Sequence, residues 1–177
     1  MVAAGRGARH TAAMAPPAFR IAPVRDAADL DATVALFRAY AAALPIDLAY
    51  QGFEAELAAL PGPYAAPTGE LLLARNDSGA AVGCVGLRRL GPSEVCEMKR
   101  LYADPAARGA GLGEALVAAI IAAAERLGYR EMRLDTLPSM AGALALYRRA
   151  GFAPTAPYYD TPVAGTLFLR RDLAPGS

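Results

Sequence analysis

The chain has 177 residues, of which 55% are hydrophobic, and its formal net charge is +1 at pH 7. A chain of this size and composition can bury the core of one domain without disulfides or metal ions. Charges of both signs are spread along the sequence, which argues against a general attraction to nucleic acid or to an anionic membrane, so we expect neither as a partner.

Two cysteines, Cys84 and Cys96, bear on the redox compartment. If the turn at residues 91–92 joins antiparallel strands, Cys84 lies near position 99 and Cys96 near position 87, so the thiols do not meet. Reduced cysteines, one histidine and the lack of a C-x-x-C or His-rich pattern predict a cytoplasmic protein without a metal site.

The first 18 residues contain no continuous apolar segment of signal-peptide length. We predict that residues 1–18 are a disordered extension, with Met14 as an alternative start, and that residues 19–177 form one domain. Charged residues interrupt the alanine-rich helices before the ~18 apolar residues that a membrane span requires.

The N-terminal half begins with a predicted strand over residues 19–25. A helix follows, capped by Asp26 or Asp29 and stopped by Pro45, with apolar residues at helical spacing. A shorter helix is predicted over residues 48–60.

Three strands, over residues 70–75, 80–89 and 94–103, are then predicted to form an antiparallel meander. A long amphipathic helix runs from near Gly111 to a C-cap at Gly128. The strand that follows, over residues 130–136, should lie parallel to the strand before the helix because a crossover helix joins them.

The last elements are a helix from Ser139, its predicted N-cap, to Ala150 and strands over residues 152–156 and 165–171. The predicted order is β-α-α-β-β-β-α-β-α-β-β.

The most informative stretch is Arg-Gly-Ala-Gly-Leu-Gly at residues 108–113, between a strand and the long helix. Glycines let the backbone approach a ligand, and the first N–H groups of a helix can bind a phosphate or pyrophosphate. A dinucleotide fingerprint from Gly109 would need glycine at position 114, where the chain has Glu114, and the Gly-Lys-Ser/Thr of a Walker A loop is absent.

Two motifs in this order carry a family resemblance. The first is Arg108-x-x-Gly111-x-Gly113, preceded by Leu-Tyr-Ala-Asp-Pro at residues 101–105, and the second is Ala-x-x-Leu-Tyr-x-x-x-Gly-Phe at residues 143–152. Together they resemble the GNAT superfamily of N-acetyltransferases. The resemblance covers residues 19–173 in element order, and its specific part runs from Glu97 to Phe152.

The resemblance implies an α/β fold with a GNAT-type mixed, mostly antiparallel sheet, in which a parallel central strand pair splays apart and helices flank the sheet. It implies transfer of an acetyl group from acetyl-CoA, as cosubstrate, to a primary amine of a small molecule by direct attack in a ternary complex. A protein or peptide N-acetyltransferase and a non-catalytic acyl-CoA-binding module are the alternatives. Dimerisation is left open, because no residue identifies an interface.

Carried over by position, contacts to the pantetheine arm of the coenzyme fall on Leu101, Tyr102 and Ala103, and the N–H of Leu101 would polarise the thioester carbonyl. Contacts to the pyrophosphate fall on the motif loop and the first turn of the helix, that is, on Arg108, Gly109, Ala110, Gly111, Leu112, Gly113 and Glu114.

Tyr147 matches the family tyrosine that acts as general acid, and a phenol with its ordinary pKa of ~10 is protonated at neutral pH. Glu97 and Asp135 are alternative general bases, each matching a carboxylate used in a different branch of the family. Period-two alternation places Glu97, Lys99 and Leu101 on one face, so Glu97 could instead pair with Lys99 or with an arginine.

For the acceptor, we hypothesise a small amine that carries a carboxylate, bound by Arg100 through bidentate pairing, with Tyr158 also lining the cleft. Solvated surface charges are the alternative reading of the arginines in this region. Met140 stands where many relatives have an asparagine that contacts the coenzyme, so that contact must be lost or replaced.

Overall fold

The computed structural model describes residues 18–107, 109–174 and 176 of the chain. The predicted extension over residues 1–18 and the predicted coenzyme contact Arg108 therefore lie outside the described residues, apart from residue 18. All strands of the described part belong to one seven-stranded sheet in the order β1-β2-β3-β4-β5-β7-β6. The strands are β1 (Phe19–Pro23), β2 (Glu70–Asn76), β3 (Ala81–Arg89), β4 (Val95–Ala103), β5 (Glu131–Thr136), β6 (Ala153–Pro154) and β7 (Leu167–Asp172).

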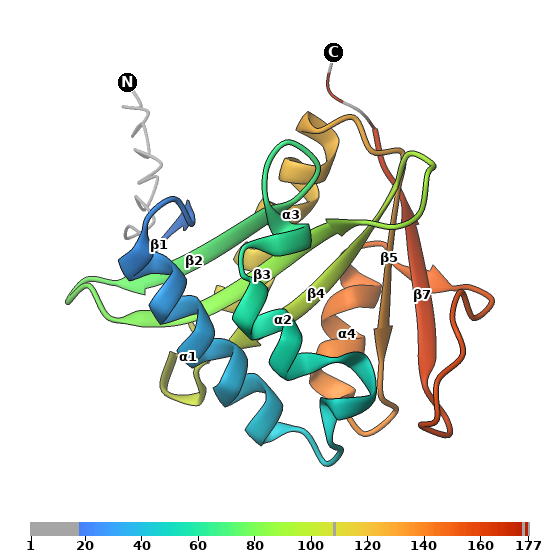
Figure 1. The fold of residues 1–177 in the computed structure, drawn as a ribbon, viewed down its shortest axis with the longest axis horizontal. Coiled ribbons are helices and arrows are strands. Elements are labelled where there is room, and N and C mark those ends of the chain that lie inside the picture. Colours follow the sequence, from blue (N-terminus) through green and yellow to red (C-terminus); the bar gives the residue numbers. More distant parts are fainter. Residues whose placement is uncertain (1–17, 108, 175, 177) are drawn as a thin grey trace, which may run out of the picture.

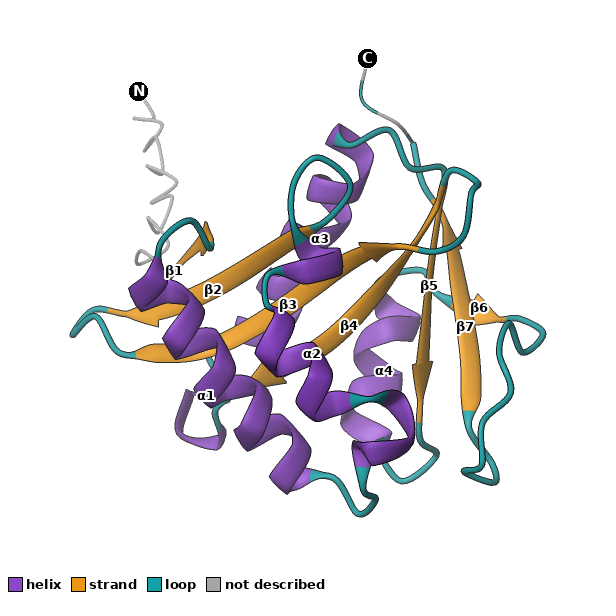
Figure 2. Ribbon diagram, viewed as in Figure 1, coloured by secondary structure: helices purple, strands orange, loops and turns teal. Residues whose placement is uncertain are grey.

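Helices cover both faces of the sheet (Figure 1). The α-helices are α1 (Ala27–Ala43), α2 (Phe53–Ala59), α3 (Leu112–Arg126) and α4 (Ala141–Arg149), and the 3-10 turns are η1 (Leu48–Gln51), η2 (Gly62–Tyr64) and η3 (Pro105–Ala107). In Figure 2, α1 and α2 lie in front of the sheet and α3 and α4 behind it. Strands β4 and β5 are parallel and the other pairs antiparallel, so the predicted mixed sheet with a parallel central pair is confirmed.

Local sequence explains most helix ends, with two corrections to the prediction. The side chain of Asp26 accepts a hydrogen bond from the N–H of Asp29 and caps α1, as one of the two predicted alternatives. The single helix predicted over residues 48–60 is instead η1 followed by α2, because Gly52 adopts φ +69° between them. Helix α4 starts after Met140, which makes no side-chain cap, so Ser139 is not the N-cap.

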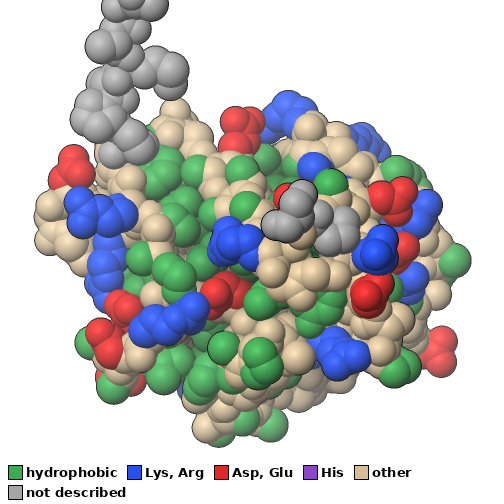
Figure 3. Space-filling view, turned by 90° about the horizontal axis from the view of Figure 1, so that it is seen from above, with side chains coloured by type: hydrophobic (Ala, Val, Ile, Leu, Met, Phe, Trp, Pro, Cys, Tyr) green, Lys and Arg blue, Asp and Glu red, His purple; other side chains and the backbone are tan. Residues whose placement is uncertain are grey.

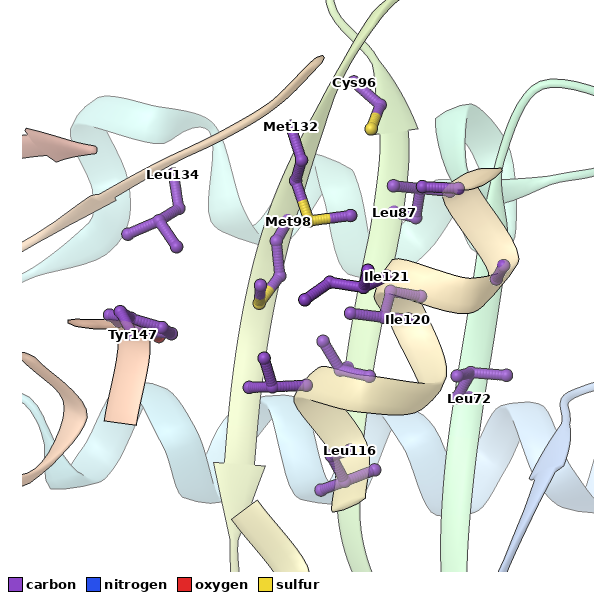
Figure 4. Close-up of a cluster of buried hydrophobic side chains, with 14 of the residues drawn as sticks. Leu72, Leu87, Cys96, Met98, Leu116, Ile120, Ile121, Met132, Leu134 and Tyr147 are labelled. Atoms are coloured by element: carbon purple, nitrogen blue, oxygen red, sulfur yellow. The ribbon is translucent and has the colours of Figure 1, made fainter. Parts of the chain in front are cut away.

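The sheet separates two hydrophobic cores. Figure 4 shows the larger one, in which Leu116, Ile120 and Ile121 of α3 face side chains of the sheet. The smaller one lies under α1 and α2 and includes Phe37 and Tyr64. Strands β2 to β4 contribute to both cores, which explains the apolar runs of β2 and β3, whereas the middle of β4 carries Glu97, Lys99 and Arg100.

Strands β4 and β5 pair over only three residues of each strand, from Val95–Glu131 to Glu97–Arg133. Beyond this point the two strands diverge, as the lower part of Figure 1 shows. The second half of β4 therefore has no neighbouring strand on the β5 side.

The same half of β4 contains a bulge, where the register with β3 shifts between Cys84–Tyr102 and Gly86–Lys99. A bulge places one extra residue on a strand and interrupts the alternation of its side chains. The predicted common face of Glu97, Lys99 and Leu101 is accordingly wrong for Leu101, which packs into the core under α3. Lys99 and Arg100, although consecutive, both reach Gln51 in η1 on the opposite face.

The bulge and the five-residue loop between β3 and β4 also correct the predicted cysteine register. Cys84 lies opposite Tyr102 rather than Lys99, and Cys96 lies opposite Arg89 rather than Leu87. Both thiols are free and buried, so the prediction of reduced cysteines is unaffected.

We expect Gly86→Ala to lower the free energy of unfolding by about 1–3 kcal/mol, because its Cβ would lie 2.7 Å from a ring carbon of the buried Tyr64. Gly142→Ala is the matched control, since Gly142 lies in α4 with open space around it, and this change should stabilise by about 0.4–1 kcal/mol or be neutral. Urea unfolding of both variants measures the difference. Equal effects would contradict close packing of Tyr64 on β3.

Candidate active site

The point at which β4 and β5 separate defines the candidate site. After the last register pair, Glu97 and Arg133, the next residues on the same face of the two strands are Lys99 and Asp135. Their side chains meet across the opening, with 3.3 Å between Lys99 Nζ and Asp135 Oδ1. This ion pair thus spans the mouth of the gap on the side of α1 and α2.

Two cavities lie next to this ion pair, and Tyr50, Gln51, Lys99 and Arg100 line both of them. The first, of about 30 Å³, is lined by Asp135 and by aliphatic side chains such as Leu44 and Leu137. The second, of about 170 Å³, is completed by Arg88, Tyr159 and Asp160. The cleft therefore has one part beside Asp135 and a second part whose walls carry three cationic side chains.

Glu97 lies inside the protein, with 1% of its surface exposed. Nε and Nη2 of Arg88 both lie 2.7 Å from Oε2, and the hydroxyl of Tyr158 donates to Oε1 at 2.9 Å. Lys99 Nζ lies 3.8 Å from Oε1 as well. Both carboxylate oxygens of Glu97 are thus engaged, which agrees with the alternative prediction that Glu97 pairs with Lys99 or an arginine. Glu97 lines neither cavity.

Asp135 has a more open environment than Glu97. Its Oδ1 is paired with Lys99, its Oδ2 accepts a hydrogen bond of 3.0 Å from Tyr159, and its side chain lines the first cavity. Each carboxylate oxygen can accept more than one hydrogen bond. Asp135 therefore keeps acceptor capacity at the wall of this cavity.

Tyr158 and Tyr159 come from the segment between β6 and β7. Their ring centroids lie 5.1 and 5.2 Å from that of Phe168 of β7 and 5.5 Å from each other. Burial, together with the adjacent carboxylates, raises the pKa of both phenols, so each remains a hydrogen-bond donor. Tyr159, rather than the predicted Tyr158, lines a cavity.

Arg100 lines both cavities, but its guanidinium already has partners. Nη2 lies 2.6 Å from Oε2 of Glu56, Nε 3.3 Å from Oε1, and Nη1 donates to Gln51 at 3.0 Å. Only 4% of the residue is exposed. These contacts occupy the bidentate face that the predicted acceptor carboxylate would need.

Tyr147 projects from α4 and is buried, with its ring 6.0 Å from that of Phe152 in an edge-to-face arrangement. Figure 4 shows it on the same side of the sheet as Leu134 and Met98. Burial raises the pKa of the phenol, and the negative charge of Asp135 contributes in the same direction. The hydroxyl is therefore protonated at neutral pH.

The glycine loop before α3 has the geometry of an anion site. Gly111 is the N-cap of α3, at φ +74°, and no side chain caps this helix end. The N–H groups of the first turn are thus available to a ligand, at the positive end of the helix dipole. Glu114 points away into an exposed ion pair with Arg149.

The predicted contacts Leu101, Tyr102 and Ala103 lie in the part of β4 that has no β5 partner. Their backbone groups on that side face the gap, as an added extended ligand would require. Met140, at the position of the family asparagine, lines the first cavity, where its sulfur lies 3.8 Å from the hydroxyl of Thr136.

Sequence reasoning missed Tyr40 and Gln51, which line the cleft, and Glu56, which binds Arg100 beside it. They belong to α1, η1 and α2, about 45 to 60 residues before the β4 residues that they approach, and no motif marks them. Only their helical context was visible in the sequence.

In the described part of the chain, no group of three or more metal-ligating side chains is arranged around a common point, and no helix has the length and apolarity to cross a membrane. On the face drawn in Figure 3, basic and acidic side chains are interspersed and do not form a patch of one sign.

Comparison with known proteins agrees with this geometry. Residues 34–152 match the model of the acetyltransferase (GNAT) family. An uncharacterised N-acetyltransferase of Schizosaccharomyces pombe is 39% identical over 161 residues, which cover 91% of this chain and 99% of the relative.

Two solved structures share the fold. A Klebsiella pneumoniae protein described as a candidate acyl-CoA N-acyltransferase is 30% identical, with a TM-score of 0.69 and coverage of 89% of this chain and 99% of that one. A phosphinothricin acetyltransferase of Sinorhizobium meliloti, solved with acetyl-CoA, is 20% identical, with a TM-score of 0.65 and coverage of 90% and 91%. With its splayed strand pair, glycine loop and family match over two thirds of its length, the chain belongs to the GNAT family and is an N-acetyltransferase.

Proposed function

We propose that this enzyme transfers the acetyl group of acetyl-CoA to the primary amine of a small molecule that also carries a carboxylate, by direct attack in a ternary complex. The observation that carries the proposal is the gap between β4 and β5. The uncapped end of α3 and the acid Tyr147 belong to elements behind the sheet, whereas Asp135 and the two cavities open in front of it.

The donor side of the site fits acetyl-CoA, which supplies an activated acetyl thioester when bound. The N–H groups at the start of α3 would hold the pyrophosphate, and the unpaired backbone of Leu101 to Ala103 would hold the extended arm. The N–H of Leu101 would stabilise the negative charge that develops on the carbonyl oxygen.

The acid and base roles follow from burial and hydrogen bonding. Tyr147 holds a proton that it can give to the departing thiolate, since burial keeps its phenol neutral. Of the two candidate bases we favour Asp135, because it lines a cavity and 14% of its side chain is exposed, whereas Glu97 is enclosed by Arg88 and Tyr158 and lines neither cavity.

The acceptor class follows from the two parts of the cleft. An ammonium group can approach Asp135 in the first cavity, while a carboxylate fits the second cavity beside Lys99 and Arg88. Arg88 binds Glu97 through Nε and Nη2. Its Nη1 makes no hydrogen bond or ion pair within the described residues. Lys99 and Arg88 therefore replace Arg100 as our proposed anchors, and the small cavities favour a small acceptor over a peptide.

Substitution in the glycine loop tests the donor site. We expect Gly111→Ala to raise the Kd for acetyl-CoA by about tenfold, because an alanine disfavours the left-handed backbone that shapes the loop. Gly79→Ala is the matched control, since Gly79 also has a positive φ but lies in the β2–β3 turn. Calorimetric titration with acetyl-CoA measures both. Unchanged affinity in Gly111→Ala would contradict the assignment of this loop.

Removal of the acid and of the base tests the chemistry. Tyr147→Phe keeps the ring packing on Phe152 but removes the proton, so kcat should fall by about 10²–10⁴-fold while coenzyme affinity stays within twofold. Asp135→Asn should lower kcat over the same range. Tyr129→Phe, which removes a phenol bonded to the carbonyl of Thr68, should leave kcat unchanged. Thiol release from acetyl-CoA with a panel of amines provides the assay, and full activity of Tyr147→Phe would refute its role.

Matched acceptors test the substrate class. Amino acids and their carboxamides differ only in the negative charge, and we expect kcat/KM to fall by about 10–100-fold on amidation, the usual effect of losing a charged hydrogen bond. Lys99→Gln should reduce this preference. Equal turnover of acids and amides would contradict the carboxylate but leave the acetyltransferase intact, whereas turnover of peptides alone would favour the protein N-acetyltransferase.

A further inference from the structure

Arg100 is the one residue other than glycine with a positive φ in the described ranges, at +59°. The left-handed region is unfavourable for residues with a Cβ, so this conformation persists only where surrounding contacts hold it. It occurs at the bulge of β4, next to Leu101, and the bulge directs the side chains of Lys99 and Arg100 to the same face of the sheet.

The contacts of the Arg100 side chain come from one segment, residues 51–56, and from α1. Glu56 of α2 binds it through both carboxylate oxygens, and Gln51 of η1 accepts a hydrogen bond from it. The rings of Phe53 and Tyr40 lie 5.3 and 5.8 Å from the guanidinium carbon. Contacts from η1, α2 and α1 therefore hold the guanidinium in place.

Glu56 is held as firmly as its partner. The hydroxyl of Tyr64 donates to its Oε1 at 2.5 Å, and 10% of its side chain is exposed. Burial alone would raise the pKa of this carboxyl, but the hydrogen bonds and charge of Arg100 outweigh burial and lower it. The carboxylate is thus charged and oriented before any substrate binds.

We propose that the Arg100–Glu56 pair is a positioning clamp, which uses α2 to hold the β4 bulge in the conformation that aims the Leu101 N–H at the thioester carbonyl. The inference rests on the proposed use of acetyl-CoA. It assigns Arg100 a role through the backbone, in place of direct contact with the acceptor. The clamp also links η1 and α2, which line the acceptor cleft, to the strand that binds the donor.

Two substitutions at position 100 distinguish the effect of Arg100 on the backbone of the bulge from the loss of its side-chain contacts. Arg100→Ala and Arg100→Gly both remove every contact of the guanidinium, but only glycine adopts φ +59° without strain. We expect kcat to fall by about tenfold in Arg100→Ala, and Arg100→Gly to recover most of that loss. The KM for the acceptor should stay within twofold in both variants.

Glu56→Gln should give a smaller fall in kcat, because the amide keeps one acceptor oxygen but loses the charge. Glu54→Gln is the matched control on the same helix, since Glu54 forms an exposed pair with Arg38, and it should leave kcat unchanged. Equal kcat values for Arg100→Ala and Arg100→Gly, or a rise in acceptor KM with kcat unchanged, would overturn the clamp and restore a contact with the acceptor.

Amide hydrogen exchange gives a readout that needs no activity. In the full chain, the exchange rate of the β4 amides should rise about tenfold in Arg100→Ala and remain close to that of the unmodified protein in Arg100→Gly. Equal exchange in the two variants would overturn the clamp. If the unmodified enzyme released no thiol from acetyl-CoA with any amine, the proposed function would fail, and the exchange rates would still decide whether the pair holds the bulge.

Discussion

The separation of β4 from β5 is the constraint on which the rest of the site depends. Their pairing stops at Glu97 and Arg133, so half of β4 keeps free backbone groups inside a sheet that is otherwise fully paired there. Unpaired backbone groups in a protein interior are costly unless a ligand or water satisfies them. This gap is where we propose that the coenzyme arm binds, and the glycine-initiated helix α3 follows the same strand after η3.

The charged side chains of the cleft alternate in sign. Arg88, Glu97, Lys99 and Asp135 form a row of opposite charges, and Glu56 with Arg100 forms a second pair beside it. Buried charges are tolerated when they are paired and hydrogen-bonded, and a broken pair is strongly unfavourable. The acceptor that we propose would preserve this balance, because it brings one charge for Asp135 and one for the cations.

In the proposed function, the two faces of the sheet have different roles. Behind the sheet, α3 and α4 contribute the proposed anion site and Tyr147, and both pack on the larger core. In front, η1 and α2 supply polar side chains that reach the bulge of β4 from a smaller core. The elements that we assign to the donor thus pack on the larger core, and those that we assign to the acceptor are joined to β4 by specific polar contacts.

The sequence by itself determined the family, the order of elements, the parallel β4–β5 pair and the glycine loop, because these depend on local periodicity and on short motifs around residues 108–113 and 143–152. It also placed Tyr147, Glu97 and Asp135 on the right elements. Only the tertiary structure decided that Glu97 is enclosed by Arg88 and Tyr158, that Leu101 turns to the opposite face, and that Arg100 is bound to Glu56. A bulge and a contact across 44 residues leave no local pattern, since both arise from packing between distant segments.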